Sequence, residues 1–164
     1  MASRFATSLD VALPDAAATH RFGTALAGML GAGDMILLSG GLGAGKTTLA
    51  RAVVERLTGD TDVPSPTYTL VQTYDAPDFE VWHADLYRLE EPSEVHHLGL
   101  LAVRDEVVSL VEWPERLGGL VPPDALPLEL RMAGTEAGAG RTAHLRPPAH
   151  TDWAARLEAA GLGR

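Results

Sequence analysis

The stretch Asp34-Met-Ile-Leu-Leu-Ser-Gly-Gly-Leu-Gly-Ala-Gly-Lys-Thr-Thr48 joins an apolar run to a glycine-rich segment. The part from Gly40 to Thr47 satisfies the pattern G-x-x-x-x-G-K-[ST], which is typical of a phosphate-binding P-loop. The apolar run Met35 to Leu38 predicts a strand buried on both faces. Apolar residues at helical spacing after the glycines predict a helix that ends at Gly59. The glycines therefore lie between a strand and a helix, where this motif requires them.

The residue types in this loop suit a bound anion. Glycines let successive backbone N–H groups turn toward it, because no Cβ atom stands in the way. The N-terminus of the following helix adds positive potential. Lys46, the only lysine in the sequence, would reach the β- and γ-phosphates, and the Thr47 hydroxyl is suited to bind Mg²⁺. The ligand-binding residues expected here are Gly40, Leu42, Gly43, Ala44, Gly45, Lys46, Thr47 and Thr48.

Length and composition narrow the class of protein. The 164 residues predict one P-loop domain, 1–164, which includes a C-terminal hairpin and helix from about residue 125. The absence of cysteine excludes disulfides and thiolate metal sites. The formal net charge is −9, whereas a protein that binds nucleic acid by itself normally has a basic surface. A partner would therefore have to supply any contact with nucleic acid. There is no signal peptide and no apolar run near the ~20 residues of a membrane span, so we expect a cytoplasmic protein.

In the rest of the sequence, the hydrophobic patterns predict strands that alternate with helices in the first part of the chain. They predict antiparallel strand pairs in the later part. This order predicts an α/β fold with a P-loop NTPase-like mixed sheet, which has a parallel core plus antiparallel strands and is flanked by helices. The expected strands are 5–11, 35–38, 68–74, 79–87, 107–111, 126–132 and 142–145, and the expected helices are 14–30, 46–57, 92–106 and 151–160.

A P-loop needs a second acidic group to hold or orient Mg²⁺, usually at the carboxyl end of a sheet strand. Asp85 and Glu112 both end predicted strands, so both are candidate catalytic and metal-binding residues. Thr67 resembles a switch threonine that senses the γ-phosphate and the metal. Trp113, next to Glu112, is either a stacking surface for the ligand or a packed aromatic residue.

Absent elements exclude other functions. The sequence contains no asparagine, so the Asn-Lys-x-Asp element with which GTPases read guanine cannot exist here. The arginines are scattered singly, which argues against the arginine-rich lid of small-molecule P-loop kinases without excluding such a kinase. His83, His96 and His97 do not have the spacing of a zinc site.

Four segments together resemble the bacterial TsaE (YjeE) family, the ATPase component of the tRNA threonylcarbamoyladenosine pathway. They are Gly-Gly-Leu-Gly-Ala-Gly-Lys-Thr-Thr (40–48), Ser-Pro-Thr-Tyr-Thr-Leu-Val (65–71), His-Ala-Asp-Leu-Tyr-Arg-Leu (83–89) and Leu-Val-Glu-Trp-Pro (110–114). The resemblance is dense from about 34 to 117 and weaker in the C-terminal third, where the hairpin tip Gly140-Arg141 is similar.

The resemblance implies weak intrinsic ATPase activity, with ATP bound by residues 42–47 and with Gly140 near the nucleotide. It implies Mg²⁺ held by Thr47 and Glu112, and roles in hydrolysis for Asp85 and Thr67. It also implies docking onto a two-protein threonylcarbamoyltransferase assembly of TsaB and TsaD type proteins. These partners would bind the tRNA, so this chain would meet tRNA only indirectly.

This chain departs from the family at the second P-loop position, where Gly41 replaces the usual acidic residue. We expect this departure to change the rate of hydrolysis more than the binding of nucleotide. The sequence as a whole favours a Mg²⁺-dependent ATPase whose hydrolysis resets a partner complex. Two alternatives stay open: a small-molecule P-loop kinase, and a nucleotide-gated adaptor without significant hydrolysis, which Gly41 makes plausible.

Overall fold

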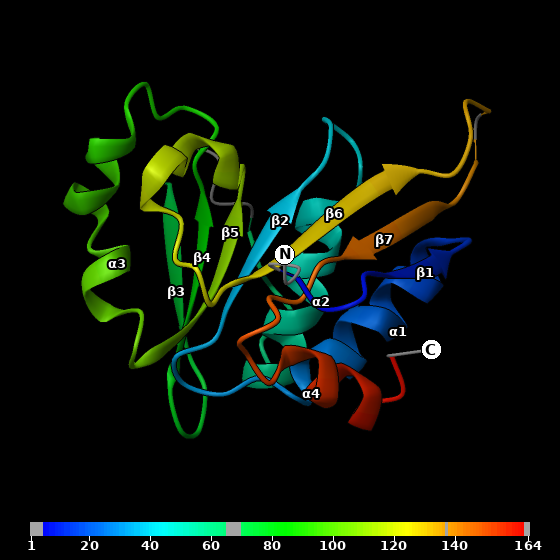
Figure 1. The fold of residues 1–164 in the computed structure, drawn as a ribbon, viewed down its shortest axis with the longest axis horizontal. Helices are drawn as coiled ribbons and strands as arrows, with labels where there is room; N and C mark the ends of the chain where they lie inside the picture. Colours follow the sequence, from blue (N-terminus) through cyan, green and yellow to red (C-terminus); the bar gives the residue numbers. More distant parts are fainter. Residues whose placement is uncertain (1–4, 65–69, 137, 163–164) are drawn as a thin grey trace.

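The computed structural model describes residues 5–64, 70–136 and 138–162. Within this part of the chain the strands form a seven-stranded sheet in the order β1-β7-β6-β2-β5-β4-β3 (Figure 1). The strands are β1 (Leu9–Leu13), β2 (Met35–Ser39), β3 (Val71–Asp75), β4 (Glu80–Asp85), β5 (Val107–Glu112), β6 (Leu126–Met132) and β7 (Arg141–Leu145).

The pairing is mixed, as the sequence predicts. Strand β2 pairs in parallel with both β5 and β6, and β4 pairs in parallel with β5. The outer pairs β1–β7, β6–β7 and β3–β4 are antiparallel. The predicted fold class, a parallel core with added antiparallel strands, is confirmed.

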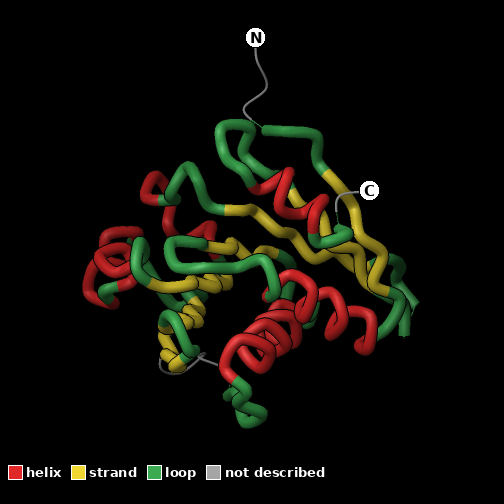
Figure 2. Tube along the Cα trace, turned by 90° about the horizontal axis from the view of Figure 1, so that it is seen from below, coloured by secondary structure: helices red, strands yellow, loops and turns green. Residues whose placement is uncertain are grey.

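The helices cover the sheet on both faces. Helices α1 (Ala16–Ala27) and α2 (Lys46–Thr58) lie side by side on one face, as Figure 2 shows from below. On the other face lie two 3₁₀ helices and a short α-helix, η1 (Pro92–Leu98), α3 (Leu100–Val103) and η2 (Pro114–Leu120), while α4 (Trp153–Ala159) ends the described chain. Among the described residues no helix is both long and apolar enough to cross a bilayer.

Strand β2 is buried on both faces because helices cover both sides of the central sheet. Successive side chains of a strand point to opposite faces. Ile36 and Leu38 accordingly pack in the hydrophobic cluster that includes α1 and α2 residues. Met35 and Leu37 pack in a second cluster with residues of η1, α3 and η2. This double burial explains the uninterrupted apolar run that precedes the P-loop.

The prediction of one helix over 92–106 is wrong. The segment forms η1 and then α3, and Gly99 separates them with φ +77°, a left-handed conformation that ends the first helical segment. Val95 and Leu100, on either side of the break, are both fully buried in the cluster beneath. The break therefore lets both short segments bury a side chain in the same cluster. The N-terminal strand also lies later than predicted, at Leu9–Leu13 instead of 5–11.

The P-loop starts where β2 leaves the sheet, and its first glycine is pressed against β6. Gly40 has φ +138°, and a Cβ atom there would lie 2.5 Å from the carbonyl oxygen of Leu130. Gly41, the next residue, has nothing within 4 Å of the corresponding position. The start of the loop is thus fixed by a backbone contact with a strand far away in the sequence.

We expect Gly40→Ala to destabilise the protein and Gly41→Ala to leave stability unchanged. The first change forces an L-residue into an unfavourable conformation against a backbone oxygen, which costs about 1–3 kcal/mol or more. The second meets no atom and should stay within about 0.5 kcal/mol of the parent. Urea denaturation of the two variants measures the difference, and equal unfolding midpoints would contradict the close approach of Gly40 to β6.

Candidate active site

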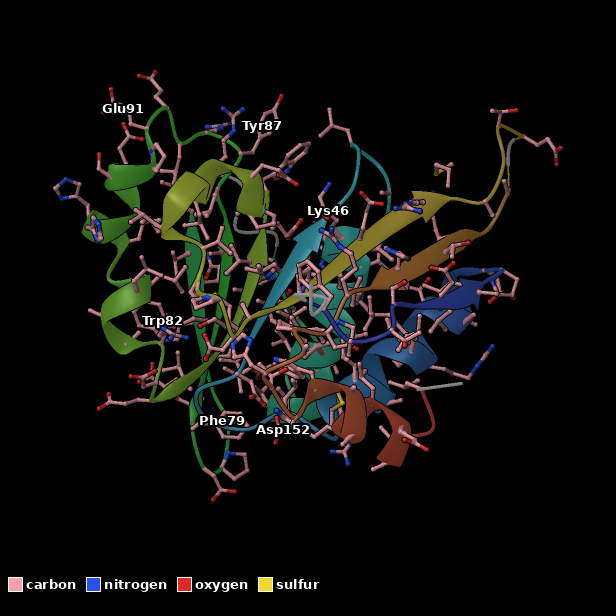
Figure 3. The ribbon with its side chains drawn as sticks, in the orientation of Figure 1. Lys46, Phe79, Trp82, Tyr87, Glu91 and Asp152 are labelled. Atoms are coloured by element: carbon pink, nitrogen blue, oxygen red, sulfur yellow. The ribbon has the colours of Figure 1, made fainter. Side chains whose placement is uncertain are left out.

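A cavity of about 390 Å³ opens at the carboxyl edge of the parallel strands. In the view of Figure 3 this edge of the sheet is at the top, and Lys46 and Tyr87 lie toward it. Phe79 and Asp152 lie at the opposite end of the molecule. Open α/β sheets bind ligands at this edge, next to the strand from which neighbouring connections diverge. The cavity is lined by Leu42, Gly43, Ala44, Gly45, Lys46, Thr47, Thr48, Asp85, Tyr87, Arg88, Glu112 and Trp113.

Lys46 begins α2 and turns its side chain back into the loop. Its ammonium group donates hydrogen bonds to the carbonyl oxygens of Gly40 (2.5 Å) and Gly41 (2.9 Å). It also lies 4.2 Å from the centre of the Trp113 ring, a cation–π contact. Burial lowers the pKa of Lys46, while the nearby carboxylate of Glu112 opposes this shift. The site therefore contains a desolvated cation that a bound anion would stabilise.

Thr47 and Glu112 meet although they are 65 residues apart in the sequence. The Thr47 hydroxyl donates to the two carboxylate oxygens of Glu112 at 3.1 and 3.3 Å. The contact follows from the sheet register, in which Leu38 of β2 pairs with Glu112 of β5. Both strands therefore end at one level, and α2 begins just above them. Glu112, with 2% exposure, points to the α2 face of the sheet.

The second acid, Asp85, pairs with Glu112 in the β4–β5 register, so the two predicted acids end neighbouring strands. Its carboxylate accepts a hydrogen bond from the Tyr87 amide at 3.0 Å, which shapes the turn after β4. Both acids line the cavity with Thr47. Oxygen ligands of this kind suit Mg²⁺, and the three residues predicted to bind metal are brought together.

His83 has a role that sequence reasoning missed. Its Nε2 atom lies 2.6 Å from Glu112 Oε2, and both side chains are buried. Because His83 and Asp85 are two residues apart on β4, they share the face on which Glu112 lies. That spacing was the available signal, since the histidine was considered only as a zinc ligand. His83 holds one carboxylate oxygen, so the orientation of Glu112 is fixed from two sides.

Trp113 forms one wall of the cavity. It follows Glu112 with φ +57°, an uncommon conformation for a residue other than glycine. Its ring centre lies 4.9 Å from that of Tyr87, which is 42% exposed at the mouth of the site. Trp113 thus packs against Lys46 and also faces the cavity, so both roles considered for it are compatible with its position. Tyr87 belongs to the TsaE-like segment 83–89, but its place in the site was not predicted.

A second cavity of about 460 Å³ adjoins the first and shares Gly45 and Thr48 with it. The β6–β7 hairpin and the start of α1 supply its other walls, including Gly140 and Arg141. Gly140 therefore lies beside the P-loop but not in the first cavity. A Cβ atom on Gly140 would lie 2.6 Å from Pro14 Cα, so the hairpin is seated closely against the turn before α1.

The structure brings most of the predicted site residues together. Ten of them line the first cavity, and Gly40 anchors the loop that forms its floor. Thr67 lies outside the described residues. Within the described part of the chain, no group of three or more His, Cys, Asp or Glu side chains is arranged to hold a metal ion. A cation here would thus need the Thr47 hydroxyl and oxygen atoms of a bound ligand or water.

Comparisons with known proteins place the chain in a family. The model of a family described as "Threonylcarbamoyl adenosine biosynthesis protein TsaE" matches residues 13–143, which include every predicted site residue. A Rickettsia bellii protein named tRNA threonylcarbamoyladenosine biosynthesis protein TsaE is 37% identical over 115 residues, which cover 70% of this chain and 80% of the relative. A Haemophilus influenzae protein of the same name is 38% identical over 124 residues, with 70% and 77% covered.

Among solved structures, the crystal structure of YdiB from Bacillus subtilis is similar in fold. It matches with a TM-score of 0.79 and 24% sequence identity, and the match covers 97% of both chains. The seven-stranded arrangement is therefore one that a solved protein adopts over almost its whole length. The family match and the sequence identity to the curated relatives carry the assignment further: this chain belongs to the TsaE family of threonylcarbamoyl adenosine biosynthesis proteins.

Proposed function

We propose that this protein is a Mg²⁺-dependent ATPase of tRNA threonylcarbamoyladenosine biosynthesis, in which ATP binding and hydrolysis reset a partner threonylcarbamoyltransferase complex. Membership of the TsaE family supports the pathway. One structural observation supports the chemistry. Lys46, Thr47 and Glu112, which are the cation, hydroxyl and acid that phosphoryl chemistry needs, line one cavity formed by a P-loop.

The first cavity would hold the phosphates. Residues 42–48 of the loop and of the start of α2 line it, and Lys46 is the cation among them. The Lys46 ammonium now binds two carbonyl oxygens of its own loop. A triphosphate would offer oxygens of greater negative charge, and charge-assisted hydrogen bonds to them are about twice as strong as neutral ones. Lys46 would therefore exchange a carbonyl for a phosphate oxygen when ATP binds.

The residues around Thr47 fit Mg²⁺. Its hydroxyl oxygen lies 3.1 Å from the Glu112 carboxylate, and Asp85 ends the adjacent strand, so oxygen donors converge from three elements. Mg²⁺ usually takes one or two protein oxygens together with phosphate oxygens and water. When bound, it would neutralise charge on the phosphates. Glu112 would hold it directly or through water, Asp85 would orient the attacking water, and Thr67 would act as the switch threonine.

The second cavity would hold the nucleoside. It begins at Thr48, one residue beyond the phosphate-binding loop, and it is bounded by Gly140 on the β6–β7 hairpin. A ligand that fills both cavities would be long, with an anionic end at Lys46 and a less polar end near the hairpin. ATP has this form. Trp113 would close the phosphate end instead of stacking on the base, since it lines the first cavity.

The proposed partners are a TsaB and TsaD type pair, with tRNA contacted through them and not by this chain. The net charge of −9 supports this division, because direct binding to RNA phosphates needs a basic surface. We propose further that residues 1–164 act as one domain and that the protein works in the cytoplasm.

We expect Lys46→Ala to abolish measurable ATP binding. Each lost charged hydrogen bond costs about 1.5–3 kcal/mol, or about 10- to 100-fold in affinity per bond. Titration calorimetry with ATP and Mg²⁺ measures the loss. Arg131→Ala is the matched control, because it removes one cation from an exposed position that lines neither cavity. Parental affinity in Lys46→Ala would refute the assignment of the phosphate site.

We expect Glu112→Gln to retain nucleotide binding but to lose phosphate release. The amide keeps a hydrogen-bonding group between Thr47 and His83, yet it lacks the charge that holds Mg²⁺. A steady-state phosphate assay at saturating ATP compares it with Glu158→Gln, which removes an exposed carboxylate on α4. If Glu112→Gln turned over at the parental rate, Asp85 would have to be the working acid.

We expect ATP to change capture of the partner pair by this protein, and we expect the captured complex to release phosphate. Immobilised protein is incubated with purified TsaB and TsaD type partners with and without ATP, and phosphate is then measured. Capture that responds to ATP without phosphate release would instead indicate a nucleotide-gated adaptor. A labelled acceptor formed from labelled ATP and cell metabolites would indicate a small-molecule kinase.

A further inference from the structure

Arg141, the first residue of β7, reaches from the hairpin to the outer side of the P-loop. Its Nε atom donates to the carbonyl oxygen of Ala44 at 3.1 Å, and one terminal nitrogen donates to the carbonyl oxygen of Gly43 at 3.1 Å. The other terminal nitrogen donates to the hairpin carbonyls of Ala139 at 2.8 Å and Gly140 at 3.4 Å. One guanidinium group therefore joins two segments about 97 residues apart in the sequence.

Peptide geometry gives this contact a consequence for the phosphate site. In a planar trans peptide the C=O and N–H bonds point in opposite directions. The Gly43 and Ala44 carbonyls belong to the peptide units whose N–H groups are those of Ala44 and Gly45. Holding these carbonyls on the outer side therefore turns the N–H groups inward. The Ala44 amide donates to the Gly41 carbonyl across the loop at 3.1 Å, so a phosphate oxygen would have to replace that carbonyl when an anion binds.

We propose that Arg141 is a positioning residue, which fixes two P-loop peptide units so that their amides face the phosphates. This inference rests on the proposed function, since it assigns a role toward the same bound polyphosphate. An arginine suits the role because its planar fork donates to several carbonyls at once and stays charged, whereas a lysine offers a point charge without that fork. Its positive charge also polarises the two peptide units toward an anion bound on their far side.

Close packing and strand pairing hold the start of β7, from which Arg141 extends. Gly140 is seated against the backbone of Pro14, with no space for a Cβ atom between them. Arg141 also pairs with Leu13 of β1 and with Met132 of β6. The guanidinium therefore extends from a backbone held on both sides, and it transmits the position of the hairpin to the P-loop.

Arg141 lines the second cavity as well, so it could instead contact the nucleoside directly. The two roles differ in what they require of the ligand. A residue that orients the P-loop amides should affect the binding of ATP and of a polyphosphate without a nucleoside to the same extent. A residue that contacts the nucleoside should matter only when a nucleoside is present. Inorganic tripolyphosphate is therefore the probe that separates the two roles.

The experiment measures binding of ATP and of tripolyphosphate, each with Mg²⁺, to the parent and to Arg141→Met, Arg141→Lys and Arg131→Met. We expect Arg141→Met to weaken both ligands by the same factor, about 10- to 100-fold. We expect Arg141→Lys to give an intermediate loss, and we expect the exposed control Arg131→Met to bind like the parent. In ¹⁵N-labelled protein without ligand, the Ala44 and Gly45 amide signals should move in Arg141→Met and stay in Arg131→Met.

The outcomes are distinct. Weaker ATP binding with parental tripolyphosphate binding would overturn the positioning role in favour of a nucleoside contact. Equal losses in Arg141→Met and Arg131→Met would also overturn it, because net charge would then be the cause. If Arg141→Met does not fold, parental binding of both ligands by Arg141→Lys refutes the need for the fork. Failure of the parent itself to bind ATP would refute the proposed function, and it is seen before any variant is compared.

Discussion

The hydrogen bond between the Thr47 hydroxyl and the Glu112 carboxylate depends on the parallel pairing of β2 with β5. Because Leu38 and Glu112 are register partners, the strand that leads into the P-loop and the strand that carries the acid end together. If β5 slipped by one residue against β2, Glu112 would turn to the opposite face of the sheet. Burial of β2 on both faces opposes such a slip, since it would exchange the two sets of apolar side chains. The hydrophobic core therefore sets the geometry of the candidate active site.

Two cations hold the P-loop through its carbonyl oxygens. Lys46 binds those of Gly40 and Gly41 from inside the loop, and Arg141 binds those of Gly43 and Ala44 from the hairpin. Since the C=O and N–H bonds of a peptide unit point in opposite directions, the Gly43 and Ala44 carbonyls that bind Arg141 leave the amides of the same peptide units on the other side. The two cations place positive charge at the loop of a protein whose net charge is −9. The acidic charge of the whole and the function proposed for the loop are therefore compatible.

The sequence predicted the local part of this site well and the remote part poorly. The P-loop and its flanking strand and helix were predicted correctly, because glycine spacing and hydrophobic period are local features. Asp85 and Glu112 were identified because strand ends could be read from apolar runs. The contact of His83 with Glu112 spans 29 residues and that of Arg141 with the P-loop spans 97, so neither partner could be predicted from local sequence. The predicted helix over 92–106 failed because one glycine with positive φ divides it.

The sequence by itself determined the glycine-rich loop between a buried strand and a helix, and it determined most of the segments that form the strands and helices around that loop. The reason is that backbone preference and amphipathic period act over a few residues. Only the tertiary structure decided that Glu112 meets Thr47, that Gly140 borders a second cavity, and that Arg141 holds the P-loop from outside. These contacts follow from strand order and register, which arise when distant apolar faces are buried together.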